Sequence, residues 1–328
     1  MNKTDNTISH YCLDPNVARN LSHRTITTPT MGSITPRWLL NLLPWVSVDA
    51  GVYRLNQVKR NIGSEVDMPE NMERVPDVMW DRLGEGMIPG SFADYEEVPK
   101  DFTLSVVQTI LRLNSHVTDI FNSPLNQKDE EMRLTIEAMK EREEWEIINN
   151  ENFGLLHNVS PCMRVQSRYG IPTPDDMDEL LSRVWKKPSF FLAHPRAIAA
   201  FGRECTHRGV PPAVVNIYGS PFITWRGVPI IPCDKMLIDG KSCNLSPSGK
   251  TSILLMRVGE REQGVIGLHQ PGIPDEGSVP SLTVKFTGID NKGIASYVLS
   301  LYFGTAVLTE DALGILENVE VGYYYDYA

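Results

Sequence analysis

Residues 60–101 constrain the fold more than any other part of this sequence, because they show neither helical nor strand periodicity. The stretch is rich in charged residues and contains Pro69, Pro76, Pro89 and Pro99. A loop of this length without secondary structure of its own is uncommon inside a compact domain. We therefore expect either disorder or an extended element that finds its partners on another chain.

The N-terminal residues 1–37 have a similar need for a partner. They are rich in Thr, Asn, Ser and Pro, and they offer little apolar surface to offset the entropy of ordering. One interpretation is a disordered tail. The alternative that we favour is an arm that becomes ordered by lying on a neighbouring subunit.

The rest of the chain mixes helices with strands. Capping residues and apolar spacing predict helices over residues 36–44 (with Thr35 as N-cap), 125–149, 173–185 (with Thr173 as N-cap) and 195–203. Alternating or continuous apolar runs predict strands over residues 51–59, 102–117, 188–194, 225–232, 252–258, 264–269, 281–288 and 296–307. Because the strands do not alternate regularly with helices, the pattern indicates an α+β fold.

Composition excludes several classes of function. The net charge is −10, and the basic residues of the arm (Lys3, Arg19, Arg24 and Arg37) are well separated, which argues against nucleic-acid binding. No apolar run approaches the roughly 20 residues that cross a bilayer. The cysteines are Cys12, Cys162, Cys205, Cys233 and Cys243, an odd number without a CxxC spacing. This usage is typical of reduced thiols in the cytoplasm.

None of the short motifs predicts an enzyme. Residues 246–252 (SPSGKTS) end like a phosphate-binding loop, but Asn244 stands where the first glycine is required. Asp175, Asp176 and Asp178 suit the first turn of a helix better than a metal site. Cys205 and His207 lack the context of a nucleophile and its base. The tyrosine-rich segment 323–327 is expected to anchor the C-terminus on a partner surface.

The order of the segments resembles the Hong Kong 97 phage-capsid fold, and more closely the family 2A encapsulins without a cyclic-nucleotide-binding insertion. The residues that carry the closer resemblance are 34–39 (ITPRWL), 49–59 (DAGVYRLNQVK), 192–195 (LAHP) and 225–232 (WRGVPIIP). The resemblance continues through residues 264–307 and so covers most of the chain after residue 33. None of these segments is a catalytic signature, so the resemblance rests on the order in which they occur along the chain.

The resemblance implies an architecture and a function. The domains would be an N-terminal arm (1–50), a strand with an extended loop (51–117), a peripheral domain with the spine helix (118–187 and 285–328) and an axial domain (188–284). Sixty subunits would form a T=1 icosahedral shell in the bacterial cytoplasm, with no catalysis, cofactor or metal of its own. The shell would enclose a cargo enzyme of the cysteine desulfurase class, which depends on pyridoxal phosphate, with a role in sulfur metabolism or storage.

The resemblance also implies a pore. In this fold a loop after a helix of the axial domain points at the five-fold axis, which makes residues 204–212 the candidate here. Its pore-lining residues would be Glu204, Cys205, Thr206, His207, Arg208 and Gly209. Five copies of His207 and Arg208 would form a positive ring that favours small anions, more so at mildly acidic pH where imidazoles gain a proton. An ordinary surface loop is the alternative.

Two other functions remain open at this point. A tailed-phage major capsid protein would share the fold, although the weakly basic arm argues against a DNA-filled head. A soluble enzyme with an unrecognised site is the more distant alternative.

Overall fold

A computed structural model describes residues 35–49, 51–56, 58–59, 94–95, 99–114, 127–217, 219–239, 249–271, 281–291 and 293–325. The N-terminal arm before Thr35 and most of the segment 60–101 lie outside these residues. The chain divides into two compact units, residues 50–103 and the remainder.

The smaller unit contains two antiparallel strand pairs among its described residues. Strand β2 (Val52–Leu55) pairs with β5 (Lys100–Thr103), and β3 (Val58–Lys59) pairs with β4 (Asp94–Tyr95). Across the first pair the guanidinium of Arg54 donates two hydrogen bonds to Asp101, at 2.8 and 3.0 Å. The expected strand over residues 51–59 is therefore two short strands.

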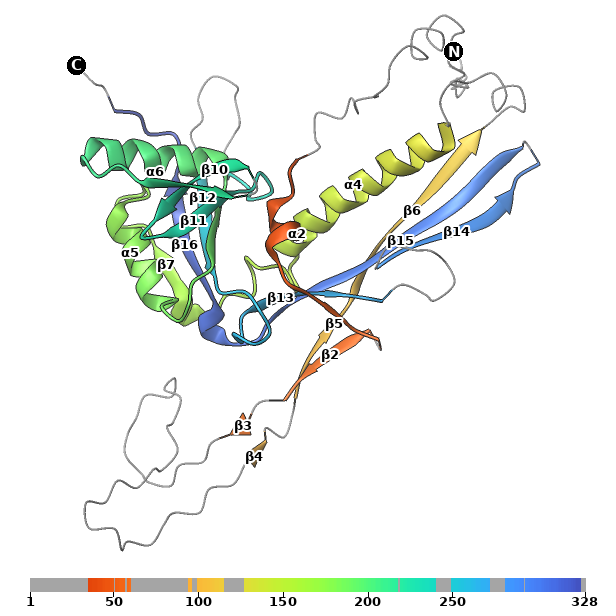
Figure 1. The fold of residues 1–328 in the computed structure, drawn as a ribbon, viewed down its shortest axis with the longest axis horizontal. Coiled ribbons are helices and arrows are strands. Elements are labelled where there is room, and N and C mark those ends of the chain that lie inside the picture. Colours follow the sequence, from red (N-terminus) through yellow and green to blue (C-terminus); the bar gives the residue numbers. More distant parts are fainter. Residues whose placement is uncertain are drawn as a thin grey trace, which may run out of the picture. The chain divides into compact units, whose positions relative to one another are not determined.

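In the larger unit, the long helix packs on a five-stranded sheet. Its central strand is β15 (Ile294–Val307), which pairs antiparallel with β6 (Ser105–Asn114), β14 (Leu282–Ile289) and β13 (Val265–His269), while β1 (Trp45–Ser47) pairs parallel with β13. Helix α4 (Gln127–Asn149) runs along β6 and packs on β6 and β15 (Figure 1). Its half-buried Met132 and Ile136 pack against the core.

A seven-stranded mixed sheet is the second large sheet of this unit. Its order is β7 (Arg164–Gln166), β16 (Leu313–Glu320), β12 (Lys250–Met256), β8 (Phe190–Ala193), β11 (Val228–Pro232), β10 (Ser220–Trp225) and β9 (Ala213–Ile217). The central strand β8 is buried at every position, which explains its unbroken apolar run. Helices α5 (Pro174–Arg183) and α6 (Pro195–His207) contact each other and pack on this sheet (Figure 1).

The first residues of the helices show which of the predicted N-caps are present in the structure. Thr173 caps α5 in a capping box with Asp176, as expected. The short helix α2 (Trp38–Leu42) begins later than expected, with Arg37 rather than Thr35 at its N-cap, because Thr35 hydrogen-bonds to α4 instead. Two 3₁₀ turns, η1 (Pro161–Met163) and η2 (Glu310–Ala312), connect further elements.

Two further expectations need correction. Residues 225–232 are not one strand but the hairpin of β10 and β11, because Arg226 and Gly227 both have positive φ, as a two-residue hairpin turn requires. The sheets also cross the expected domain boundaries. Strands β7 and β16 join the sheet that holds β8, whereas β13 belongs to the sheet of β15.

Candidate pore segment at the end of helix α6

Helix α6 positions the candidate pore residues, and its start follows from the local sequence. Pro195 occupies the first turn, where a missing amide donor does no harm. The Nδ1 atom of His194 accepts a hydrogen bond from the backbone amide of Arg196 at 3.0 Å and so caps the helix. The side chains of Ala197, Phe201 and Cys205, one turn apart, are buried against the sheet.

The helix continues to His207, four residues beyond its expected end at Arg203. It then closes on Gly209, whose φ of 71° is accessible to glycine without strain. The amide of Gly209 donates to the carbonyl of Thr206 at 3.1 Å, and the amide of Val210 donates to that of Cys205 at 2.9 Å. This is the Schellman pattern of a helix C-terminus. The expected pore loop over residues 204–212 is therefore helical over its first four residues.

Glu204 lies at the centre of a polar cluster rather than on an open loop. Its side chain is buried, with 4% of the residue exposed. The carboxylate accepts hydrogen bonds from the phenol of Tyr325 and from the guanidinium of Arg208. Burial acts to raise the pKa of Glu204, but these two hydrogen bonds outweigh it and hold the pKa below its usual range. The carboxylate is therefore ionised at neutral pH and paired.

The C-terminal segment lies along the same end of α6. Arg203 donates to the carbonyls of Val321 and Tyr323 at 3.0 and 3.1 Å, and its guanidinium lies 4.2 Å from the ring centroid of Tyr324. The ring of Tyr325 stacks on His207 with centroids 4.1 Å apart. The described residues 323–325 of the tyrosine-rich segment therefore contact their own chain, whereas the sequence led us to expect a partner surface.

The charges of the segment are more balanced than the sequence suggested. Arg208 donates not only to Glu204 but also to Asp175 of helix α5, at 3.0 Å. Two carboxylates therefore surround one guanidinium, and Arg208 supplies little net positive charge. The exposed His207 also interacts electrostatically with Glu204, so both residues that were expected to form a positive ring have a carboxylate nearby.

Cys205 is not placed for chemistry. The residue is fully buried, and burial, followed by the nearby Glu204, raises the pKa of its thiol to about 11. A thiol with this pKa stays protonated at neutral pH and is a poor nucleophile. The sequence 246–252 also fails as a phosphate-binding loop, because Lys250 begins strand β12 rather than a helix.

The residues after α6 are unusually exposed. From Thr206 to Asn216 every residue except Pro212 is exposed, and this run includes Val210, Val214 and Val215. Strand β9 lies at the edge of the seven-stranded sheet, and its first four residues are exposed on both faces. A free edge with exposed valines is an association site unless something covers it. Sequence analysis missed β9, although its short apolar run directly after two prolines was the available signal.

Within the described ranges, one group of three side chains has the composition of a metal site: Glu144, Cys233 and Asp234. Lys235 already binds both oxygens of Asp234 at 3.0 Å. Burial raises the pKa of Cys233 to about 12, which keeps its sulfur protonated. The group is therefore better described as the edge of an ion-pair cluster than as a set of metal ligands.

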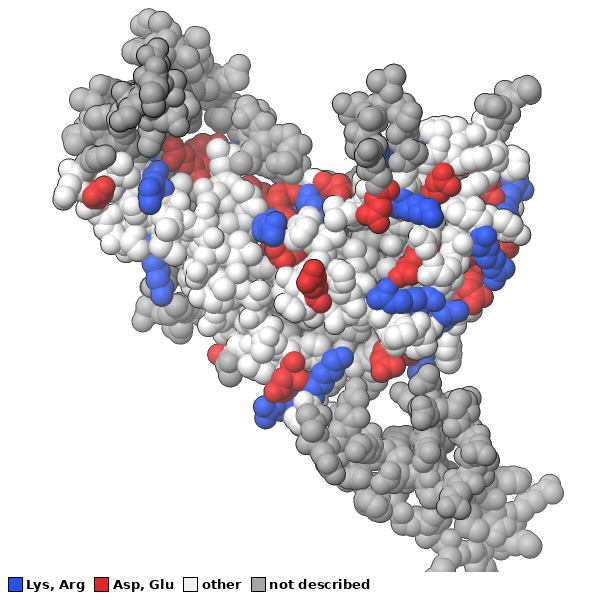
Figure 2. Space-filling model, turned by 180° about the vertical axis from the view of Figure 1, so that it is seen from behind, with Lys and Arg blue, Asp and Glu red and all other residues white. Residues whose placement is uncertain are grey.

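Two surface properties bear on the expected partners. On the face seen in Figure 2, the basic and acidic side chains of the described residues are interspersed, without the basic stripe that binds nucleic acid. Among the helices that the structure describes, none is both long and apolar enough to cross a membrane.

Comparison of folds defines the class first. The chain superposes on the capsid of a native GTA particle with a TM-score of 0.57 at 12% identity, covering 97% of this chain and 99% of that one. At this identity the likeness concerns the fold alone. Together with the spine helix α4 and the two sheets, it places the chain in the Hong Kong 97 phage-capsid fold and confirms the α+β class.

The family follows from closer relatives. The profile "SrpI-like: Type 2A encapsulin shell protein SrpI-like" matches residues 64–323. The type 2A encapsulin shell protein SrpI of Synechococcus elongatus is 51% identical over 310 residues, 94% of each chain. A type 2A encapsulin shell protein of Mycobacterium leprae is 47% identical over 311 residues, 94% of this chain and 95% of the other. A subunit of the holo-SrpI encapsulin complex from Synechococcus elongatus superposes with a TM-score of 0.78 at 48% identity, covering 97% and 99% of the two chains.

The chain therefore belongs to the SrpI-like family of type 2A encapsulin shell proteins. Members of this family are structural shell proteins rather than enzymes. The resemblance noted from the sequence is confirmed, and the family membership argues against both a tailed-phage capsid protein and an unrecognised enzyme.

Proposed function

We propose that copies of this chain close into a T=1 icosahedral shell of sixty subunits that encloses a cargo enzyme in the bacterial cytoplasm. The observation that carries the proposal is the likeness to a subunit of the holo-SrpI encapsulin complex at 48% identity over nearly the whole chain. Identical subunits that repeat one heterologous contact around closed symmetry axes form a finite particle.

The exposed residues after α6 support a contact between subunits. Within the described part of the chain, one edge of strand β9 pairs with no other strand, and Val214 is 63% exposed. A shell would cover this apolar edge, which a lone subunit leaves in water. We therefore place the segment 206–216 at an interface between copies of the chain.

The start of this segment overlaps the proposed five-fold pore. Residues Glu204–Gly209 would approach the axis, with Glu204 and Cys205 supporting the exposed Thr206 and His207 from behind. Because Arg208 is paired with two carboxylates, the preference for anions would depend mainly on the exposed His207. We keep the division into peripheral and axial domains as part of this proposal, with β7 and β16 in the axial sheet and β13 in the peripheral sheet.

The proposed cargo is a cysteine desulfurase that carries pyridoxal phosphate, and the proposed role is in sulfur metabolism or storage. This assignment rests on the resemblance to the family 2A encapsulins, and the related SrpI complex is a holo complex, which supports a filled shell. The shell itself would hold no cofactor and no nucleic acid.

The experiment is co-expression of the chain with a candidate desulfurase, followed by sedimentation through a density gradient. We expect the absorbance of pyridoxal phosphate and the desulfurase activity to sediment with the particles, and shells made without the second polypeptide to be inactive. Desulfurase that stays at the top of the gradient would contradict the cargo assignment. Cysteine turnover by shells alone would contradict the structural role, and a high ratio of absorbance at 260 to 280 nm would indicate packaged nucleic acid.

A further inference from the structure

Helix α2 is the first described element after the N-terminal arm, and its contacts with helix α4 attach the arm to the subunit. The side chain of Leu39 in α2 is fully buried and belongs to the core. Just before α2, the amide of Thr35 donates to Glu141 at 2.8 Å, and Arg37 forms ion pairs with Glu141 and with Glu137. Whatever loosens α2 from α4 therefore also loosens the base of the arm.

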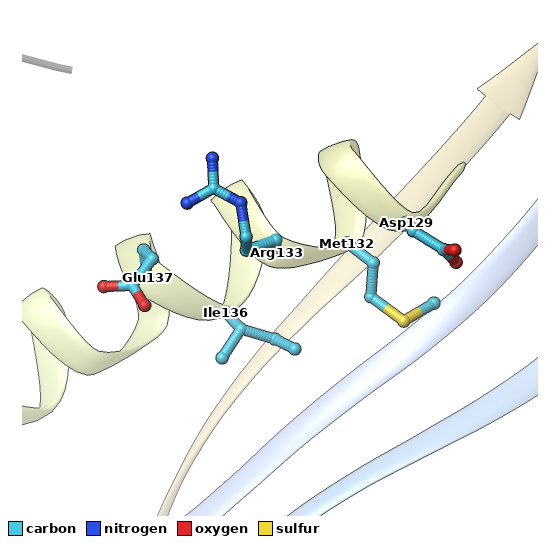
Figure 3. Close-up of a pocket in the computed structure, with 5 residues that line it drawn as sticks. All are labelled: Asp129, Met132, Arg133, Ile136 and Glu137. Atoms are coloured by element: carbon cyan, nitrogen blue, oxygen red, sulfur yellow. The ribbon is translucent and has the colours of Figure 1, made fainter. Parts of the chain in front are cut away.

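Two neighbouring carboxyls of α4, Glu143 and Glu144, are buried on different sides of the helix, with 7% and 1% of each residue exposed. Figure 3 shows Met132 and Ile136 extending from α4 toward the strands of the five-stranded sheet. Glu143 follows Ile136 by seven residues, so it falls in the same row of the helix. Glu144 is turned from that row by about 100°. Its carboxylate accepts a hydrogen bond from the backbone amide of Leu39, so Glu144 is the carboxyl that faces α2.

The loop after β11 lies against Glu144 as well. A carboxylate oxygen of Glu144, the sulfur of Cys233 and a carboxylate oxygen of Asp234 lie within 4.8 Å of one another. The nearby cation, Lys235, is shared, because it pairs with Asp234 at 3.0 Å and with Glu141 at 2.6 Å. A proton on Glu144 removes the repulsion between its carboxylate and that of Asp234.

The wider surroundings contain more carboxyls than cations. Three cations lie in this region: Arg37, Lys140 and Lys235. They face five carboxyls: Glu137, Glu141, Glu143, Glu144 and Asp234. Burial lowers the pKa of His194, which faces Asp234, so this imidazole adds no charge at neutral pH. Burial also raises the pKa of Glu144 to about 7 and so agrees with the excess of carboxyls.

We propose that Glu144 is a proton-dependent latch for the base of the arm: the protonated side chain holds α2 on α4, and loss of the proton releases α2. The ionised carboxylate is unfavourable in the closed form because it is buried beside Asp234 and Glu141, and opening of α2 lets water reach it. The closed form therefore binds the proton more tightly than the open form, so opening becomes more frequent as the pH rises. This inference goes beyond the proposed shell function and rests on contacts within one chain.

Hydrogen exchange of the full-length protein, followed by mass spectrometry at pH 6 and pH 8, tests the latch. The exchange rates of residues 38–43 are divided by the intrinsic rates at each pH, so that the ratio reports the opening of α2. If opening returns the pKa of Glu144 from about 7 to 4.5, this ratio should rise about tenfold between the two pH values. The fully buried strand β8 should keep its protection at both.

Three variants assign the effect to its residue. Glu144→Gln keeps the shape of the side chain but cannot ionise, so the tenfold rise should disappear. Glu143→Gln is the matched control, because it removes the neighbouring buried carboxyl that lies in the sheet-facing row, and the rise should persist. Asp234→Asn, whose side chain is 46% exposed and tolerates the change, should reduce the rise by removing the carboxylate beside Glu144.

The outcomes separate the latch from other causes. No rise in the parent, or the same rise in Glu144→Gln as in the parent, overturns the proposal. Loss of protection in β8 at pH 8 also overturns it, because the whole subunit would then be opening. A protein that shows the predicted rise but forms no closed particle supports the latch and contradicts the shell.

Discussion

Thr35 donates two hydrogen bonds to Glu141, one from its backbone amide at 2.8 Å and one from its hydroxyl at 3.1 Å. The other oxygen of the same carboxylate pairs with Lys235 at 2.6 Å. One side chain of α4 therefore joins the base of the arm to the loop that follows β11. Burial acts to raise the pKa of Glu141, but Lys235 and Thr35 together outweigh it and lower the pKa.

Replacing Glu141 with Gln should destabilise the subunit. The amide keeps the shape of the side chain but removes the charge that pairs with Lys235, which is itself largely buried. We expect a loss of roughly 1.5–3 kcal/mol in the free energy of unfolding, measured by urea titration. Glu151→Gln, at an exposed position just past the end of the same helix, is the control. Equal effects of the two changes would show that the cluster around Glu141 does not stabilise the fold.

The pH dependence of stability should reveal a buried carboxyl pair. Burial raises the pKa of Glu143 and of Glu144 from 4.5 to about 7. A folded-state pKa above the unfolded one means that the folded protein binds the proton more tightly. Stability from these groups is therefore full below pH 4.5 and is lost as the pH rises to about 7.

Glu143→Gln removes one of the two titrating groups and tests whether the stability of the parent falls as the pH rises. At pH 8 the variant should be more stable than the parent by on the order of 2 kcal/mol, and the difference should shrink toward zero at pH 5. Urea midpoints at the two pH values provide the measurement, with the same exposed Glu151→Gln as control. A variant less stable than the parent at pH 8 would mean that the ionised carboxylate is favourable where it lies.

The contact between Tyr325 and Glu204 should stabilise the end of α6. Tyr325→Phe keeps the ring that stacks on His207 but removes the hydroxyl that donates to the buried carboxylate. The expected loss is about 1–2 kcal/mol in denaturant unfolding. Tyr324→Phe is the matched control, since its exposed ring keeps its place over Arg203. If both variants unfold like the parent, the C-terminal segment does not hold the helix end.

Strand β9 should matter for assembly and not for folding. Val214 is exposed in the subunit, so Val214→Asp should leave the unfolding midpoint nearly unchanged. In a shell that covers this edge, the buried carboxylate would oppose association. Size-exclusion chromatography should show loss of particles in favour of small species. Particles that form as in the parent would place β9 away from any interface.

Local sequence signals predicted the elements whose ends are decided locally. The start of α5 follows from Thr173, Pro174 and Asp176, which form the capping box within one turn. The buried strand β8 follows from its apolar run. Helix α4 was predictable because its long charged stretch contains no Pro or Gly to interrupt a helix.

Tertiary contacts determined the element ends that the sequence did not predict. Helix α6 extends past Arg203 because Glu204 finds its partners in Arg208 and in Tyr325, which is 121 residues away in sequence. Thr35 is not a cap because Glu141, 106 residues away, binds it. The hairpin turn at Arg226 and Gly227 was detectable in principle, since Gly favours positive φ, but Arg is not a usual first turn residue.

The mass of the purified particle tests the central claim most directly. Sixty copies of a 36.8 kDa chain give a closed T=1 particle of about 2.2 MDa before any cargo is counted. Native mass spectrometry or mass photometry, with an electron micrograph of the same sample, should show this species with icosahedral symmetry. A preparation that contains only folded monomers or small oligomers, under conditions in which the subunit is stable, would contradict the account.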